Sequence, residues 1–227
     1  MDWLVQLFHK IKDVPELIRS VGYPGMAAII FVETGLLVGF FLPGDSLLFT
    51  AGLACNASSA LHKLAPLDLL TLNMYLIPAA IIGDTVGYWI GYKAGAGMYS
   101  REKTFFFRKD HLLKTREFYE KHGGYTIVIA RFVPLLRTFA PVVAGIAQMP
   151  YRRFLMFNIL GGIGWISGLS VLGYYLGGIE WIGAHLEASI MAIIFISLLP
   201  VIFTVLKSWL SSGKAAPALD AGATDVK

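Results

Sequence analysis

Two long apolar stretches of this chain carry charged residues that a membrane interior tolerates only in pairs. Residues 26–54 read MAAIIFVETGLLVGFFLPGDSLLFTAGLA, and residues 125–149 read YTIVIARFVPLLRTFAPVVAGIAQM. A charge at mid-bilayer costs about 2.5–3.5 kcal/mol on insertion scales, so four uncompensated charges would cost about 10–14 kcal/mol. Two acids in the first stretch and two arginines in the second therefore predict ion pairs inside the protein or in a wet cavity. The four residues are Glu33, Asp45, Arg131 and Arg137.

The composition is that of an integral membrane protein. Of the 227 residues, 56% are hydrophobic and only 15% are charged, and the mean hydropathy is +0.64. A soluble domain carries about 25% charged residues. We expect a single membrane domain over residues 21–207, preceded by an amphipathic interfacial helix at 1–20 and followed by a disordered tail at 211–227.

Both charged stretches are interrupted where a helix should break. The first contains Pro43 and Gly44, and the second contains Pro134 and Pro141. Proline removes a backbone donor and glycine loosens the chain, so each stretch predicts two half-helices that form a re-entrant hairpin. Broken backbone at membrane depth is tolerated only where it is buried in protein or lines a cavity.

A glycine-rich span follows each hairpin, which suggests an internal repeat. The spans expected at 69–92 and 154–176 end in similar aromatic-glycine signatures, GYWIG at 87–91 and GYYLG at 173–177. Because one span separates the hairpins, they should enter from opposite faces, as in inverted-repeat transporters. The expected fold is all-α, with repeat 1 at about 24–98, a basic loop at 100–122, repeat 2 at about 124–178 and a last span at 188–207.

The basic loop predicts the orientation of the chain. Residues 101–121 hold seven lysines and arginines, which could suggest nucleic acid, but the positive-inside rule favours a cytoplasmic loop beside membrane spans. The C-terminus then lies in the cytoplasm, while the side of the N-terminus stays open. We expect no nucleic-acid partner, and the oligomeric state is left undetermined.

The residues at hand point to transport rather than catalysis. The chain has one cysteine, Cys55, and its histidines fall outside the apolar spans, so we expect no metal and no cofactor. It carries no nucleophile elbow, P-loop or zinc helix motif, so we expect no enzyme. Two further readings stay open: a proton-dependent transporter of small molecules or ions, and a membrane-homeostasis or assembly factor that transports nothing.

Arginine beside carboxylates suits a phosphate group. Its planar fork binds phosphate oxygens in a bidentate manner, which makes Arg131 and Arg137 candidate phosphate ligands. The acids Glu33 and Asp45 would hold the arginines in the empty site and exchange a proton when phosphate arrives. Asp84, in the first span, is a further candidate for this site, or a structural hydrogen-bonding residue of the bundle.

Four motifs together resemble the DedA family of bacterial inner-membrane proteins, and the likeness is to its founding branch. They read FVETG at 31–35, FLPGDSLL at 41–48, FYEKHGG at 118–124 and ARFVPLLRTFAP at 130–141. The resemblance implies two re-entrant hairpins, a fold shared with eukaryotic lipid scramblases, and roles in membrane homeostasis. It also implies proton-dependent transport or recycling of undecaprenyl phosphate, with Glu33 and Asp45 matching the family's essential acids and Arg131 and Arg137 its essential arginines.

Overall fold

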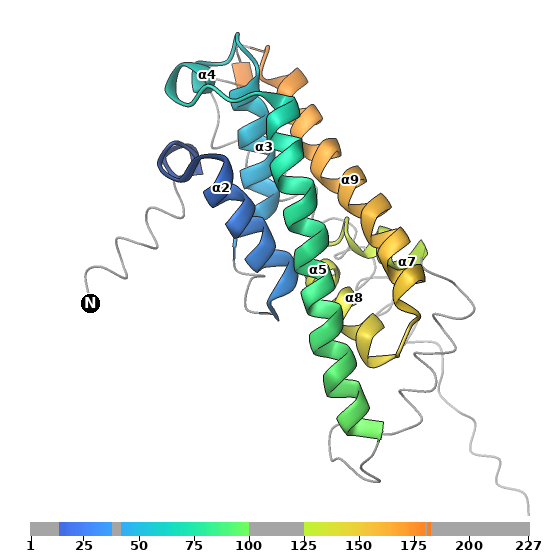
Figure 1. The fold of residues 1–227 in the computed structure, drawn as a ribbon. Coiled ribbons are helices and arrows are strands. Elements are labelled where there is room, and N and C mark those ends of the chain that lie inside the picture. The colour runs from blue at the N-terminus through green and yellow to red at the C-terminus, as the bar shows by residue number, and fades with distance from the viewer. Residues whose placement is uncertain (1–13, 38–41, 100–124, 180, 183–227) are drawn as a thin grey trace, which may run out of the picture.

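The computed structural model describes residues 14–37, 42–99, 125–179 and 181–182, and all elements in these ranges are helices (Figure 1). Most of the expected N-terminal helix, the basic loop, the last span and the tail lie outside the described residues. The helices, in chain order, are α2 (Val14–Gly35), α3 (Gly44–Cys55), α4 (Ala60–Leu64), α5 (Leu69–Tyr99), α7 (Tyr125–Ala130), α8 (Pro134–Ile146) and α9 (Tyr151–Leu176).

Helix α2 is two helices joined by a kink at Gly22. This residue has φ 57° and ψ −165°, in the region that glycine adopts without the steric cost of a Cβ. Pro24 follows in the first turn of the second part, where a missing backbone N–H costs little. The second part buries Met26, Ile30 and Glu33 against the rest of the bundle.

The expected breaks at Pro43–Gly44 and at Pro134 are where helices begin. α3 starts at Gly44, with Pro43 as the residue before it, and α8 starts at Pro134. The expected break at Pro141 is wrong, because α8 continues through it. A proline removes one hydrogen bond of a helix, and here its ring packs against α5, with Cβ 3.6 Å from an ideal Cβ on Gly87.

Two long helices form the centre of the bundle. α5 has 31 residues and α9 has 26, so at 1.5 Å per residue each is longer than the roughly 30 Å hydrocarbon core of a bilayer. They run antiparallel: Asn73 of α5 binds Ser167 and Ser170 near the end of α9, and Ile81 of α5 binds Asn158 near its start. The expected spans at 69–92 and 154–176 lie within these two helices.

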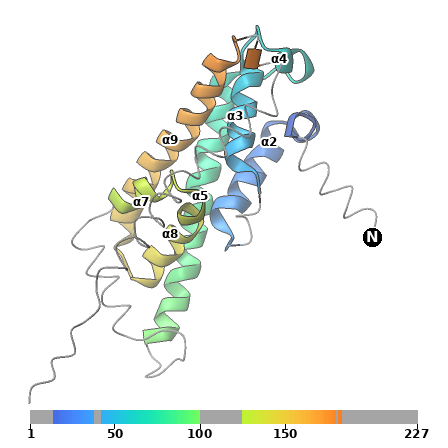
Figure 2. The same cartoon turned by 180° about the vertical axis from the view of Figure 1, so that it is seen from behind.

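Each short helix packs along the long helix of the other half of the chain. α3 lies beside α9, and α8 lies beside α5 (Figures 1 and 2). α3 has 12 residues and α8 has 13, so each is only about 18–20 Å long and too short to cross a bilayer.

Glycines bring these helix pairs into backbone contact, and the contacts repeat in register. An ideal Cβ would overlap or press on a carbonyl oxygen of the partner helix at six glycines. Between α3 and α9 the pairs are Gly52 with Ser170, Gly173 with Phe49, and Gly177 with Leu53; between α8 and α5 they are Gly145 with Tyr88, Gly91 with Val142, and Gly95 with Ile146.

The two sets of contacts are equivalent residue by residue. Every α8 residue in the second set lies 93 positions after its α3 counterpart, and every α5 residue lies 82 positions before its α9 counterpart. The repeat expected from the sequence is therefore present in the packing, with a corrected register. The aromatic-glycine signatures align Gly87 with Gly173, whereas the contacts align Gly91 with Gly173, which is a shift of about one helical turn. The helix equivalent to α3 is α8, which starts at Pro134 and not at Pro141.

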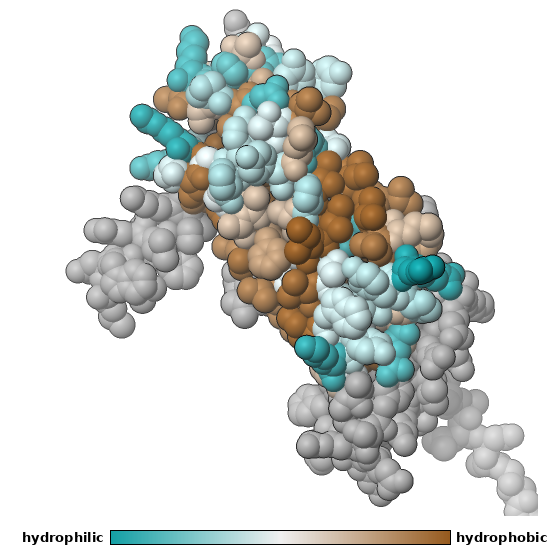
Figure 3. All heavy atoms as spheres, viewed as in Figure 1, coloured by the Kyte–Doolittle hydropathy of each residue, from teal (hydrophilic) through white to brown (hydrophobic). Residues whose placement is uncertain are grey.

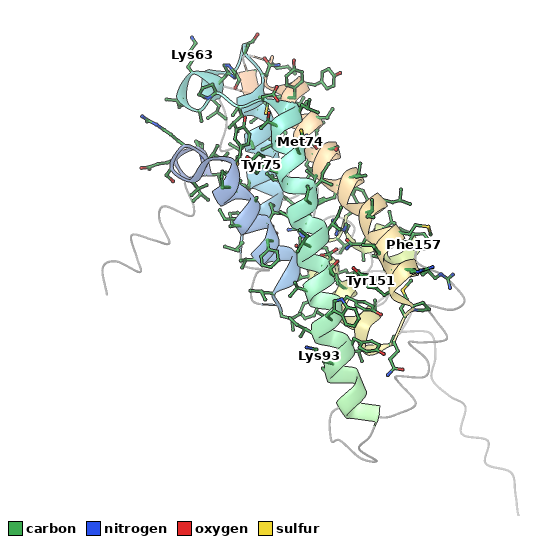
Figure 4. All side chains as sticks on the ribbon, in the orientation of Figure 1. Lys63, Met74, Tyr75, Lys93, Tyr151 and Phe157 are labelled. Atoms are coloured by element: carbon green, nitrogen blue, oxygen red, sulfur yellow. The ribbon has the colours of Figure 1, made fainter. Side chains whose placement is uncertain are left out.

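The outer surface of the bundle is apolar. The most apolar windows of α5 and α9 are only 28% and 33% buried within the protein, which is unlike the core helix of a soluble domain. Leu70, Met74 and Tyr175 are about 70% exposed. Hydrophobic residues form a belt over the face in Figure 3, and Lys63 and Lys93 lie toward opposite ends of the bundle in Figure 4. Such a surface suits lipid rather than water.

Candidate functional site

Arg137 lies in the first turn of α8 and binds two carboxylates from the other helix break, on α2 and α3. Its Nη2 donates to Oε1 of Glu33 at the end of α2, and its Nη1 donates to Oδ1 of Asp45 in the first turn of α3. Glu33 is fully buried and Arg137 is 7% exposed, whereas the Asp45 side chain is 13% exposed. The three residues therefore join the two helix breaks of the chain. We call them, with Trp165, the Arg137 cluster.

Trp165 of α9 completes the Arg137 cluster. Its Nε1 donates to Oδ1 of Asp45 at 2.9 Å, and Cζ of Arg137 lies 4.7 Å from the centre of its ring. The indole thus contacts both the acid and the arginine, through a hydrogen bond and a cation–π interaction.

Gly44 makes room for the Glu33 carboxylate. An ideal Cβ on Gly44 would overlap all three terminal atoms of the Glu33 side chain. The glycine that begins α3 is therefore also required by the close approach of a buried acid to the backbone.

Arg131 forms a second cluster on the two long helices. It follows α7, and its Nη2 donates to Oδ2 of Asp84 in α5 and to Oδ1 of Asn158 in α9. The amide of Asn158 also donates to the carbonyl oxygen of Ile81 at 3.0 Å. Arg131, Asp84 and Asn158 are at most 3% exposed. We call these three residues the Arg131 cluster.

The structure thus brings together most, but not all, of the residues expected to meet. Glu33 and Asp45 both bind Arg137, as the paired charges predict. The expectation that they also bind Arg131 is wrong, since Arg131 binds Asp84 instead. The two arginines lie on different segments, Arg131 after the end of α7 and Arg137 within α8, and each faces different neighbours.

Two residues of the site were not singled out from the sequence. Asn158 and Trp165 lie within the apolar run of α9, where a lone amide and a lone indole look like ordinary residues of a membrane helix. The only signal for Asn158 is that it is an amide inside a span, which in a membrane finds a hydrogen-bonding partner on a neighbouring helix.

Several polar atoms of the site have no hydrogen-bonding partner among the described residues. They include Nε of both arginines, Nη1 of Arg131 and the hydroxyl of Thr138, which follows Arg137. A buried donor without a partner is costly. The two donors beside the Arg137 cluster, Nε of Arg137 and the hydroxyl of Thr138, are therefore groups that a bound anion or water could satisfy.

The formal charges of the site do not cancel. Glu33, Asp45 and Asp84 carry three negative charges when ionised, and the two arginines carry two positive charges. Arg131 and Asp84 balance each other, so the excess negative charge falls on the Arg137 cluster. Within the described residues, no group of three or more His, Cys, Asp or Glu side chains could hold a metal ion.

These features define an all-α membrane protein with two clusters of ionisable side chains buried at its helix breaks. The profile of the VTT domain matches residues 42–175. The chain is 39% identical to the protein DedA of Escherichia coli, over 92% of this chain and 95% of that protein. The chain therefore belongs to the DedA family, as the four sequence motifs predict.

Other relatives extend this assignment. An uncharacterized membrane protein of Mycobacterium leprae is 40% identical over 85% of this chain and 83% of its own length. The inner membrane protein YghB of Escherichia coli is 36% identical over 81% of this chain and 80% of its own length. No solved structure matches the chain.

Proposed function

We propose that this protein is a lipid translocase that moves undecaprenyl phosphate, or a related anionic phospholipid, across the bacterial cytoplasmic membrane. The observation that carries the proposal is the Arg137 cluster. A guanidinium between two carboxylates, deep in an apolar bundle, holds its fork in a geometry that phosphate oxygens also satisfy. In the absence of lipid, the carboxylates occupy the phosphate's place.

Coupling to protons follows from the excess charge of this cluster. When a phosphate takes over Arg137, Glu33 and Asp45 lose their counter-ion. Two unpaired carboxylates in an apolar interior are costly. Uptake of protons by these acids would relieve the cost, and their release would follow when the lipid leaves. Each translocation event would then move protons together with the phosphate.

The membrane arrangement is part of the proposal. We propose that α2–α3 and α7–α8 are re-entrant hairpins entering from opposite faces, because α3 and α8 are too short to span and their packing on the long helices is equivalent. The basic loop and the C-terminus would lie in the cytoplasm, where positive residues gather beside spans. The two arginines would then lie near mid-membrane, within reach of lipid from either leaflet.

Lipid flux in liposomes tests the function. The purified protein is reconstituted, and NBD-labelled polyprenyl phosphate, phosphatidylglycerol and phosphatidylcholine are followed by dithionite quenching with and without a pH gradient. We expect the two anionic probes, polyprenyl phosphate and phosphatidylglycerol, to move faster than in empty liposomes and faster than the zwitterionic phosphatidylcholine. Polyprenyl phosphate should move fastest, and the gradient should change the rate. Equal movement of phosphatidylcholine would indicate an unselective scramblase.

The same liposomes separate the remaining readings. Proton-dependent uptake of a small solute without lipid movement would indicate a small-molecule transporter. No movement of any probe would favour a membrane-homeostasis or assembly factor. A change in the chemical structure of the probe, detected by mass spectrometry, would show an enzyme, which we do not expect.

A further inference from the structure

We infer that the Arg131 cluster is a charge-balanced anchor that positions the α7–α8 break, and that Arg137 alone exchanges its carboxylates for the phosphate. This inference rests on the proposed function and gives the two arginines different roles. Asp84 and Asn158 become positioning residues, which act on the phosphate site through Arg131.

The partners of the two arginines lie on different parts of the fold. Among the described residues, Arg131 binds Asp84 on α5 and Asn158 on α9, both on the long helices. Asn158 in turn binds the backbone of α5, so the cluster joins both long helices to the end of α7. Arg137, by contrast, binds the two ends of the other helix break, on α2 and α3.

The guanidinium of Arg131 has little space for a ligand. Its Nη2 is taken by Asp84 and Asn158. The edge that carries Nη1 and Nε faces the backbone of α9 at two adjacent glycines. An ideal Cβ on Gly162 would lie 3.1 Å from Nη1, and one on Gly161 would lie 3.4 Å from Nε. The α9 helix therefore covers the edge on which a phosphate would otherwise bind.

Exposure separates the clusters in the same way. All members of the Arg131 cluster are at most 3% exposed, whereas Asp45, which binds Arg137, is 13% exposed and is the most exposed charged group of the site. Among the charged groups of the site, Asp45 is therefore the one most open to a ligand from outside.

Charge balance gives a third, independent reason. Arg131 and Asp84 form a one-to-one pair with a neutral amide beside them, so the formal charge of this cluster is zero without a bound proton or anion. The excess carboxylate lies at Arg137. The Arg137 cluster therefore exchanges protons and phosphate, and the Arg131 cluster keeps the same contacts throughout.

A rescue experiment distinguishes an anchor from a phosphate ligand. In the liposome assay with NBD-labelled polyprenyl phosphate, Arg131→Met leaves Asp84 buried without a counter-ion, and we expect transport to fall about tenfold or more. Adding Asp84→Leu removes the stranded charge. Because apolar replacement of both members of a buried ion pair is often tolerated, we expect the double variant to recover about tenfold over Arg131→Met.

The matched control uses the other arginine. Arg137→Met combined with Asp45→Leu should not recover transport, because the proposed phosphate ligand is gone. A folded Arg131→Met/Asp84→Leu variant that transports no better than Arg131→Met would overturn the inference. So would recovery of the Arg137→Met/Asp45→Leu variant.

A conservative variant provides the second readout and decides the question if the double variant does not fold. Asp84→Asn keeps the shape of the side chain and a hydrogen-bonding oxygen for Arg131. We expect the pH profile of its transport to coincide with that of the unmodified protein, while Asp45→Asn shifts the profile. An equal shift in Asp84→Asn would show that the Arg131 cluster also exchanges protons and would overturn the inference.

The experiments distinguish a failure of the proposed function from a failure of the anchor inference. If the unmodified protein moves no probe, the lipid translocase proposal fails. The anchor is then tested by the thermal unfolding of the same variants in detergent. Recovery of the unfolding temperature in Arg131→Met/Asp84→Leu relative to Arg131→Met supports the anchor, and absence of recovery overturns it.

Discussion

The guanidinium of Arg137 lies over the indole ring of Trp165, with its Cζ 4.7 Å from the ring centre. The same indole donates a hydrogen bond of 2.9 Å to Asp45. A residue of one long helix thus holds together an acid and an arginine that come from the two different helix breaks. The ion pair is therefore part of the bundle packing as well as a candidate binding site.

Two replacements of Trp165 should destabilise the protein to different extents. Trp165→Phe keeps an aromatic face for Arg137 but loses the hydrogen bond to Asp45, and we expect it to lower the free energy of unfolding by about 1.5–3 kcal/mol, as for hydrogen bonds to charged groups. Trp165→Leu also loses the cation–π interaction and should cost more. Chemical denaturation in detergent measures both. An unchanged free energy of unfolding in Trp165→Phe would contradict the prediction.

Arg137→Ala should abolish transport while the protein still inserts into the membrane. The substitution removes the proposed phosphate ligand and leaves two buried acids without a counter-ion, so a lower stability of about 3–5 kcal/mol is also expected. Arg137→Lys restores the charge but not the planar fork, and its transport should remain poor. Membrane fractionation and liposome flux measure the two effects. Full transport by Arg137→Lys would exclude bidentate phosphate binding.

The two acids of the Arg137 cluster should control the pH dependence of transport. Glu33→Gln and Asp45→Asn preserve the shape of the side chain but cannot titrate, so we expect either variant to flatten or shift the pH profile of flux. Asp68→Asn is the control: two hydrogen bonds from Thr71 lower the pKa of this exposed carboxyl below its usual value. Asp68 therefore stays ionised near neutral pH, and its removal should leave the profile unchanged. Unchanged profiles in both Glu33→Gln and Asp45→Asn would exclude these acids as coupling groups.

Two glycine-to-alanine substitutions should have opposite effects. In Gly44→Ala the new Cβ overlaps the Glu33 carboxylate, so the acid must move away from Arg137, and we expect a loss of about 1–3 kcal/mol of stability together with impaired transport. Gly168→Ala, in α9, places a new Cβ that has no atom of another helix within 4 Å among the described residues. It should be neutral or stabilise the protein by up to about 1 kcal/mol through helix propensity. Equal tolerance of both changes would show that Glu33 does not need this approach to the backbone.

Equivalent glycines of the two repeats should respond alike to enlargement. Gly52→Val separates α3 from α9, and Gly145→Val separates α8 from α5, because each Cβ would overlap a carbonyl oxygen of the partner helix. We expect both to lower the unfolding temperature by similar amounts. Gly164→Ala, whose nearest contact is Phe132 at an ordinary 3.7 Å, is the control. A large loss in only one of the two repeats would contradict the equivalent packing.

Much of the fold and most residues of the site could be predicted from the sequence. Composition and hydropathy predict a membrane domain, and the starts of α3 and α8 follow from Pro43, Gly44 and Pro134, because these residues act on the local backbone. The cost of unpaired charges in an apolar interior predicts that Glu33 and Asp45 meet an arginine. Each of these conclusions depends only on neighbouring residues or on a general property of the bilayer.

The tertiary structure decided which charges pair and how the repeats align. That Arg131 binds Asp84 and Asn158, and that Trp165 bridges Asp45 and Arg137, depends on which faces of α5 and α9 meet around the two breaks. Pro141 stays inside α8 because its ring packs against another helix, and the repeat register follows from glycine contacts between distant segments. These features depend on which helices lie close together, and no local pattern of residues encodes that. A buried charge, for example, requires a partner but does not specify which one.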